Sequence, residues 1–245
     1  MFVMRDGGRS LAAASSGRIT GTQRTNHVSW GGLWQMTIRT AHRDALRLLF
    51  AIRAGAQPLN HADLPDEVGM FRGEARLWAF DFWIRNPDYM AAELLDLYSA
   101  TGDAGWLASA ESIFSNGEPD LRRVPMIRYF FGAFDRLDDA LALLRSRDLV
   151  RITGVKSFDK VRETDFVLTT RGDSLCNTCL VEAPVLQWYA DRAALVAKVA
   201  GDRGGAALKE AQYKRAAYAE TTLGGIIPSI AAEVARRLAE IKATT

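Results

Sequence analysis

Residues 130–172 read FFGAFDRLDDALALLRSRDLVRITGVKSFDKVRETDFVLTTRG, and this stretch decides the fold that the sequence predicts. In its first part, apolar residues recur at alternating steps of four and three, as they do along one face of an α-helix. They are Phe130, Phe134, Leu137, Leu141 and Leu144. Two extended segments follow at residues 148–152 and 165–169, separated by a polar turn at 156–160. We therefore predict a helix, then a two-stranded β-hairpin, then the start of another helix.

Helical periodicity also dominates the rest of the chain. Apolar residues at helical spacing, interrupted by glycine and proline, predict further helices. They are expected over residues 30–54, 71–84, 88–100, 104–114, 174–181, 184–200, 206–219 and 228–241, with a loop at 58–65 and a helical stretch from Val124 that runs into the helix at 130. The predicted fold class is mainly α.

The hairpin and its flanking helices resemble a winged helix of the MarR or PadR kind. The matching residues are the helix end LLRSRDLV at 143–150 and the return strand LTTRG at 168–172, and the likeness covers roughly a fifth of the chain. The resemblance implies a helical protein with an embedded winged helix. It also implies a homodimer, because the helices after Cys176 resemble the dimerisation helices of MarR-like proteins. The apolar seam of that dimer is expected from Val185, Leu186, Trp188, Tyr189, Leu195, Val196 and Val199.

Charge is unevenly distributed along the chain. The net charge is +6 over residues 1–59, −9 over 60–120, +4 over 121–172 and +1 over 173–245. Together with the Asn-Gly-Glu-Pro break at 116–119, this predicts a flexible tail (1–28), an acidic helical domain (29–118), a winged-helix unit (119–175) and C-terminal helices (176–245). The asymmetry suits a nucleic acid bound to the basic unit, and it suits charge pairing within or between chains equally well.

Basic side chains of the predicted winged helix are candidates for contacts with DNA phosphates, because lysine and arginine neutralise the DNA backbone. The candidate DNA-binding residues are Arg136, Arg145, Arg147, Arg151, Lys156, Lys160 and Arg162. A winged helix that binds DNA places the helix in the major groove and the hairpin on the backbone or minor groove. The first interpretation is therefore a transcriptional regulator that binds double-stranded DNA.

Three aspartates argue against this interpretation. Asp135, Asp138 and Asp139 are expected on the outward face of the helix, where phosphate would repel them. The first helix of a helix-turn-helix pair is also hard to place upstream of residue 130. The alternative interpretation is a non-enzymatic adaptor that binds another protein through its winged helix and its acidic helices.

The sequence lacks the common signatures of enzymes. It contains no Gly-x-Ser-x-Gly elbow, no phosphate-binding loop and no His-Glu-x-x-His. No catalytic residue, metal or cofactor is therefore predicted. Cys176 and Cys179 form a CxxC pair, which can be redox-active or half of a zinc site. No pair of histidines lies at ligand spacing, so the simpler interpretation is two buried thiols on an apolar helix.

Nothing in the hydropathy of the chain predicts a membrane protein. No apolar run approaches the roughly 20 residues that a membrane span needs, and the first residues have no apolar core of a secretory signal. The arginine-rich segment up to His27 is either a flexible tail or a targeting peptide, and its lack of apolar periodicity favours the tail. The expected location is the cytoplasm.

Overall fold

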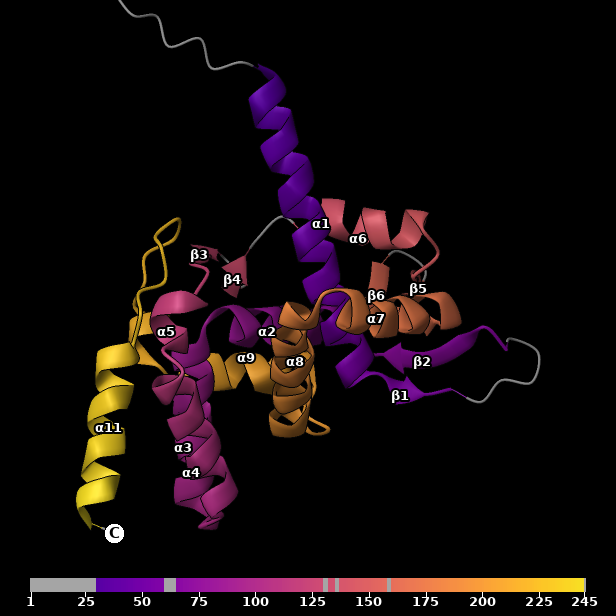
Figure 1. Cartoon of the computed structure of the whole chain (residues 1–245). Coiled ribbons are helices and arrows are strands. Elements are labelled where there is room, and N and C mark those ends of the chain that lie inside the picture. Colours follow the sequence, from indigo (N-terminus) through magenta and orange to yellow (C-terminus); the bar gives the residue numbers. More distant parts are fainter. Residues whose placement is uncertain (1–29, 60–64, 130–131, 135–136, 158–159, 245) are drawn as a thin grey trace, which may run out of the picture.

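The computed structural model describes residues 30–59, 65–129, 132–134, 137–157 and 160–244, without the side chains of 30–40, 134 and 155–163 (Figure 1). The protein is mainly helical with a small antiparallel sheet, as the sequence predicts. The longer helices are α1 (Trp30–Gly55), α2 (Glu74–Arg85), α3 (Pro87–Thr101), α4 (Ala104–Ser115), α6 (Asp138–Ser146), α7 (Thr170–Glu182), α8 (Gln187–Ala200), α9 (Gly205–Tyr213) and α11 (Ala231–Thr244). Two single-turn helices, α5 (Glu118–Leu121) and α10 (Ala216–Ala219), and a 3-10 turn, η1 (Pro184–Leu186), complete the helical elements.

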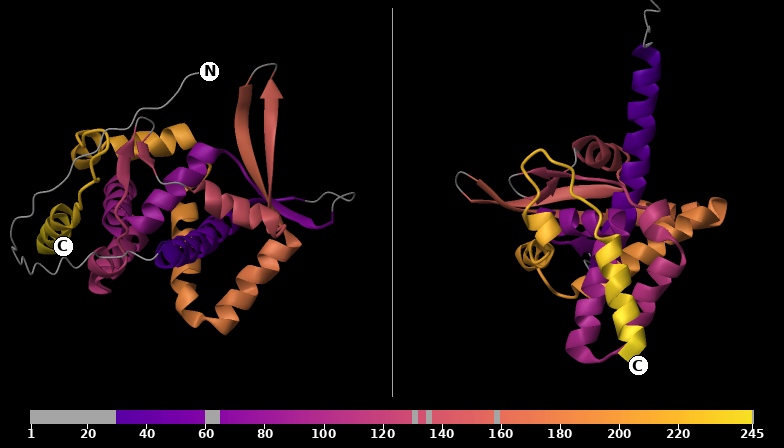
Figure 2. Two further views of the ribbon diagram at one scale, coloured as in Figure 1. Left: turned by 90° about the horizontal axis from the view of Figure 1, so that it is seen from above. Right: turned by 90° about the vertical axis from the view of Figure 1, so that its left-hand side faces the viewer.

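The main sheet has the strand order β1-β2-β6-β5, and all neighbours are antiparallel. Its strands are β1 (Gln57–Pro58), β2 (Glu67–Phe71), β5 (Val150–Ser157) and β6 (Lys160–Thr169). β5 and β6 form the predicted hairpin, which projects from the helical body (Figure 2). A separate two-stranded ribbon consists of β3 (Ile127–Tyr129) and β4 (Gly132–Phe134).

The core is built around the C-terminal half of α1, which packs against α2, α6 and α8. Leu48, Leu49 and Ile52 of this half are completely buried. The first half of α1 extends beyond the body of the protein (Figure 1). Aromatic rings join the helices to the sheet: Phe71 of β2 meets Phe80 of α2 edge to face, with ring centroids 5.1 Å apart. Pairs of this geometry stabilise a core beyond their buried area.

Acids of the segment 60–120 pair with arginines from other parts of the chain. Asp81 is completely buried and lies 2.6 Å from Arg47 of α1. Further pairs of this kind are Glu93–Arg203, Asp96–Arg215, Asp96–Arg237 and Glu118–Arg192. At these positions, acids of the negatively charged segment thus form ion pairs with arginines of other segments of the same chain.

The prediction of a helical stretch from Val124 that continues into one helix from residue 130 to 144 is wrong in its first part. Residues 127–129 and 132–134 are strands, and α6 begins only at Asp138. Gly132 has a φ of 123°, and a Cβ there would lie 2.8 Å from the hydroxyl oxygen of Tyr218. The amide of Ala133 donates a hydrogen bond to that hydroxyl at 2.6 Å. The contact with Tyr218 thus holds these residues extended, although their apolar spacing also fits a helix.

The helix predicted for residues 71–84 and the loop predicted for 58–65 also need correction. Phe71 belongs to β2, the helix begins at Glu74, and Pro58 lies in β1, whereas 60–64 lie outside the described residues. β2 is short and carries Gly69, so it has no strong strand signal of its own. Its extended conformation depends on pairing with β6, far along the chain. The remaining helices agree with the prediction to within a few residues, apart from the break between α9 and α10 and the later start of α11.

The predicted boundaries between the four parts of the chain stay predictions. β2 lies in the segment expected to be a separate acidic domain, yet it pairs with the hairpin strand β6. None of the described helices combines the length and the hydropathy that crossing a bilayer requires.

Candidate nucleic-acid interface

The turn between α6 and the hairpin is fixed by close backbone contacts. Thr169 ends β6, and its Oγ1 accepts a hydrogen bond from the amide of Gly172 at 3.1 Å, which caps α7. The same hydroxyl donates to the carbonyl oxygen of Asp148 at 2.7 Å. A Cβ on Gly172 would lie only 2.3 Å from the carbonyl oxygen of Leu149. The LTTRG segment therefore holds the start of α7 against the turn that leads into β5.

Arg145 and Arg147 lie exposed at the C-terminal end of α6, beside the base of the hairpin. Neither forms an ion pair with a residue in the described part of the chain. The carbonyl groups of a helix C-terminus favour positive charge nearby, so the position also suits the stability of α6. These two guanidinium groups are accessible for contacts with an anionic partner.

Three of the other candidates lie on the distal half of the hairpin. The register places Lys156 opposite Val161, and Ser157 opposite Lys160, so both lysine positions are close to the tip. Arg162 follows on β6, beside an irregularity in the pairing between Val155 and Lys156. The structure gives the backbone of these positions and not their side chains. Arg136 lies outside the described residues.

Arg151 has a different environment from the other candidates. Its guanidinium lies 3.0 Å from Asp148 Oδ1 and 3.2 Å from Glu67 Oε1, and it also contacts Asp66. The hydrogen bond from Arg151 holds the pKa of Asp66 below its ordinary value. With three carboxylates around it, this guanidinium is engaged within the protein. The sequence contained no local signal for Asp66 and Glu67 as its partners, because no element was predicted for residues 66–70, where β2 begins at Glu67.

Acidic side chains occupy the first turn of α6. Asp138 and Asp139 are both exposed, whereas Leu141 and Leu144 face the core. Asp135 lies outside the described residues. Aspartate near a helix N-terminus interacts favourably with the helix dipole, so both residues help to start the helix. The outward face of α6 is thus acidic at its beginning and basic at its end.

A helix-turn-helix pair is not formed directly ahead of α6. In the described residues between α5 and α6, the chain forms an irregular segment and then the β3–β4 ribbon. This is a departure from the pattern that the winged-helix resemblance implies. The helix, the hairpin and the additional strand β2 are present, but a helix joined to α6 by a short turn is absent from this part of the described chain.

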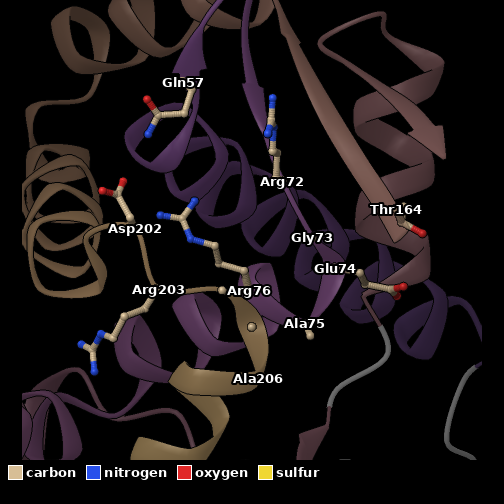
Figure 3. A pocket seen from close by; sticks show the side chains of 12 residues that line it. Gln57, Arg72, Gly73, Glu74, Ala75, Arg76, Thr164, Asp202, Arg203 and Ala206 are labelled. Atoms are coloured by element: carbon tan, nitrogen blue, oxygen red, sulfur yellow. The ribbon is translucent and has the colours of Figure 1, made fainter. Parts of the chain in front are cut away.

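A polar pocket of about 840 Å³ lies at the base of the hairpin, between the start of α2 and the turn before α9 (Figure 3). Arg76 points toward Asp202 in this pocket, but its guanidinium donates hydrogen bonds to the carbonyl oxygens of Gly55 and Gly201, at 3.1 and 2.9 Å. It also stacks on two rings, with centroid distances of 5.0 Å to Phe71 and 4.9 Å to Phe80. Burial lowers the pKa of Arg76, an effect that the charge of Asp202 opposes. Arg76 thus connects α2 to α1 and to the turn after α8.

Two further arginines line the same pocket. Arg203 lies 2.9 Å from Glu93 and donates to the carbonyl oxygen of Val199 at 2.8 Å, so it too is engaged within the protein. Arg72 is exposed at the rim, next to Gly73. The pocket therefore adds one accessible guanidinium to the basic surface near the hairpin.

The cysteine pair has the environment of structural thiols. Cys176 is completely buried and Cys179 is half-buried, which confirms the interpretation for Cys176. Burial raises the pKa of Cys176 to about 12 and also raises that of Cys179. A reactive cysteine needs a lowered pKa, so neither thiol is activated here. No group of three or more histidine, cysteine or acidic side chains suited to a metal ion occurs within the described ranges.

Most residues of the predicted dimer seam pack against other parts of the same chain. Val196 and Val199 are buried in the core, and Leu186, Trp188, Tyr189 and Leu195 pack against it. Val185 is the exposed member of the set. Dimerisation stays a prediction.

Comparison with protein-family models, curated proteins and solved structures finds no match to this chain.

Proposed function

We propose that the protein binds double-stranded DNA through the β5–β6 hairpin and the C-terminal end of α6. The observation that carries the proposal is the projection of this hairpin from the body, with Arg145 and Arg147 exposed at its base. Lys156, Lys160 and Arg162 add three basic positions along the hairpin. Helix end and hairpin together provide five basic residues for contacts with phosphates.

The acidic first turn of α6 determines how DNA is contacted. Asp138 and Asp139 repel phosphates, so the beginning of the helix stays away from the backbone while its basic end approaches. Arg151 stays with its carboxylate partners and supports the base of the hairpin. Binding then consists mainly of phosphate contacts, which position a protein on DNA but carry little sequence information.

Fluorescence anisotropy with a random DNA duplex, repeated across a salt series, tests the proposal. Each neutralised phosphate contributes about −0.9 to the slope of log K against log salt. Five contacts predict a slope near −4.5, and the double variant Lys156→Glu/Lys160→Glu is expected to reduce its magnitude by about 2. The control Lys214→Glu/Arg236→Glu changes the same number of charges on α11 and on the residue that follows α9, and should leave the slope unchanged.

If the salt dependence of the Lys156→Glu/Lys160→Glu variant is unchanged, the hairpin does not contact DNA. Absence of DNA binding even at low salt would overturn the proposal as a whole. The variant Asp138→Lys/Asp139→Lys gives an independent check. If α6 approaches DNA as proposed, replacing these acids strengthens binding and steepens the salt dependence.

A second candidate function, an adaptor that binds another protein, is favoured by exposed apolar side chains around the β3–β4 ribbon. Ile127 forms an isolated β-bridge with Ile226. The two residues are 49% and 65% exposed. Tyr129 and Leu223 are also exposed. Large apolar side chains gathered on a surface mark many protein-binding sites. If DNA binding is absent, a complex purified with the full chain and lost in Ile127→Ser/Ile226→Ser would support this function.

A further inference from the structure

We propose that a pocket between α1, α6 and α7 binds an organic acid with a single alkyl chain, whose carboxylate is held by Arg147 and Arg171. The pocket has a volume of about 520 Å³, within the range of small-molecule sites. α1 packs against both α6 and α7, so the three helices that form its walls are held in place by the core (Figure 1). The proposal does not depend on DNA binding, although Arg147 belongs to both sites.

The floor of the pocket is aliphatic. Six leucines from the three helices and the turn before β5 line it: Leu46, Leu49, Leu143, Leu144, Leu149 and Leu175. One leucine from each helix is only half-buried, namely Leu46, Leu143 and Leu175. Covering them removes apolar surface from water, which is favourable in proportion to the area. No phenylalanine, tyrosine or tryptophan is among the described residues of the lining, so the floor suits an alkyl chain.

The rim of the pocket is positively charged. Arg147 follows the last turn of α6 and Arg171 lies in the first turn of α7, and both are exposed. Neither is ion-paired with any residue that the structure describes. His42 lies on the same rim, and the described lining includes no aspartate or glutamate. A cation in the first turn of a helix is disfavoured by the helix dipole, so an anion beside Arg171 is stabilising.

Backbone contacts bring the two arginines to the same end of the pocket. The hydroxyl of Thr169 donates to the carbonyl oxygen of Asp148 at 2.7 Å, and the amide of Thr169 donates to that of Leu149 at 3.3 Å. These contacts join the residues just after Arg147 to the residue two positions before Arg171. A carboxylate placed there accepts charge-assisted hydrogen bonds from both guanidinium groups.

The combination of floor and rim decides between possible occupants. The N-terminal segment of the chain, residues 1–29, carries four arginines and one aspartate, so its charge does not complement a cationic rim. An inorganic anion would leave the leucines uncovered, and an uncharged hydrocarbon would leave the arginines without a counter-charge. An amphiphile with one negative head and an aliphatic body matches both parts.

Octanoate is the probe for the test, with acetate as the control for its head and 1-octanol as the control for its chain. Binding to the full chain is measured by isothermal titration calorimetry in the absence of DNA. The imidazole resonance of His42, assigned by its loss in His42→Gln, reports where the ligand binds. We expect saturable binding of octanoate with a shift of this resonance, and binding at least about ten-fold weaker for both controls.

One pair of variants tests the charged rim. Arg147→Gln/Arg171→Gln is expected to weaken octanoate binding about ten-fold, because each exposed ion pair contributes roughly a three-fold change. Arg145→Gln is the control, since Arg145 is exposed on the same end of α6 but does not line the pocket. It should bind octanoate as the wild type does.

A second pair tests the aliphatic floor. The Thr178 hydroxyl bonds only to the carbonyl oxygen of Ser174 in its own helix, so Thr178→Phe leaves the fold intact while its ring fills the pocket. It should abolish octanoate binding. Val181→Phe adds the same ring at a position of α7 that is 76% exposed and outside the lining, and should leave binding unchanged.

Three results would overturn the proposal. The first is octanoate that gives no saturable heat and leaves the His42 resonance unmoved at tens of millimolar. The second is equal affinity for octanoate and either control compound, and the third is unchanged affinity in a folded Thr178→Phe variant. Because DNA is absent from these titrations, each result is distinct from a failure of the proposed DNA binding.

Discussion

Gly172 lies where the chain leaves β6 and enters α7, against the backbone of the turn before β5. Its amide donates to Thr169, and its missing side chain leaves room for the carbonyl oxygen of Leu149. The sequence motif LTTRG predicted the strand and its end correctly. It could not show why glycine is needed, because the clash involves a residue more than twenty positions earlier.

Gly172→Ala is expected to lower the free energy of unfolding by about 1–3 kcal/mol, because a Cβ forces two packed backbone segments apart. Urea unfolding followed by circular dichroism measures the change. Gly204→Ala is the control: its Cβ would meet nothing within 4 Å, and its φ is −72°. A Gly172→Ala protein as stable as Gly204→Ala would contradict the close contact.

At the scale of elements, the hairpin was predictable and its third partner was not. The two extended segments and the polar turn indicated β5 and β6, although Lys156, Ser157 and Lys160, which were predicted in the turn, lie in the strands. β2 carries no comparable pattern. The sequence therefore did not indicate that Arg151 pairs with Glu67, the first residue of this strand, and with Asp66 just before it, and Arg151 was assigned to DNA. The helix predicted from 130 failed for a related reason: Tyr218, on α10, decides the conformation of Gly132 and Ala133.

The Asp66–Arg151 pair predicts how the sheet responds to acid. The pKa of Asp66 is lowered in the folded protein, so the charged form stabilises the fold above the ordinary carboxyl pKa of about 4, and this stabilisation is lost as the pH falls through the lowered value. Asp66→Asn should therefore be less stable than the wild type at pH 7, and the difference should be smaller near pH 2. Thermal unfolding at the two pH values measures this. A stability difference that stays constant with pH would show that the ion pair is not responsible.

At the scale of the whole molecule, a buried carboxylate connects the C-terminal segment to α3. Asp88 Oδ2 accepts hydrogen bonds from Ser229 Oγ at 2.7 Å and from the amide of Ile230 at 2.8 Å. Asp88 follows Pro87 and looks in the sequence like a residue that caps its own helix. Its bond to the amide of Tyr89 fits that view, but the partners some 140 positions away were beyond any local pattern.

Asp88→Ala is expected to destabilise the protein by about 3–5 kcal/mol, because it leaves buried donors without their acceptor and removes the carboxylate that lies 3.9 Å from Nε of Arg123. Amide hydrogen exchange should show α11 losing protection ahead of α1. Glu240→Ala is the control, since its exposed pair with Arg236 contributes less than about 1 kcal/mol. Uniform loss of protection across the molecule would argue against a local connection.

The pairing of β2 with β6 also sets the order of events while the protein is made. The amide of Gly73 and the carboxylate of Asp165, which it contacts, are 92 positions apart. At a synthesis rate of about 5–20 residues per second, β2 leaves the ribosome roughly 5–20 seconds before its partner strand exists. During that interval its edge is open, while the helices α2 to α5 can already form. The nascent chain therefore acquires its helical part first, and the sheet closes only when the hairpin has been synthesised.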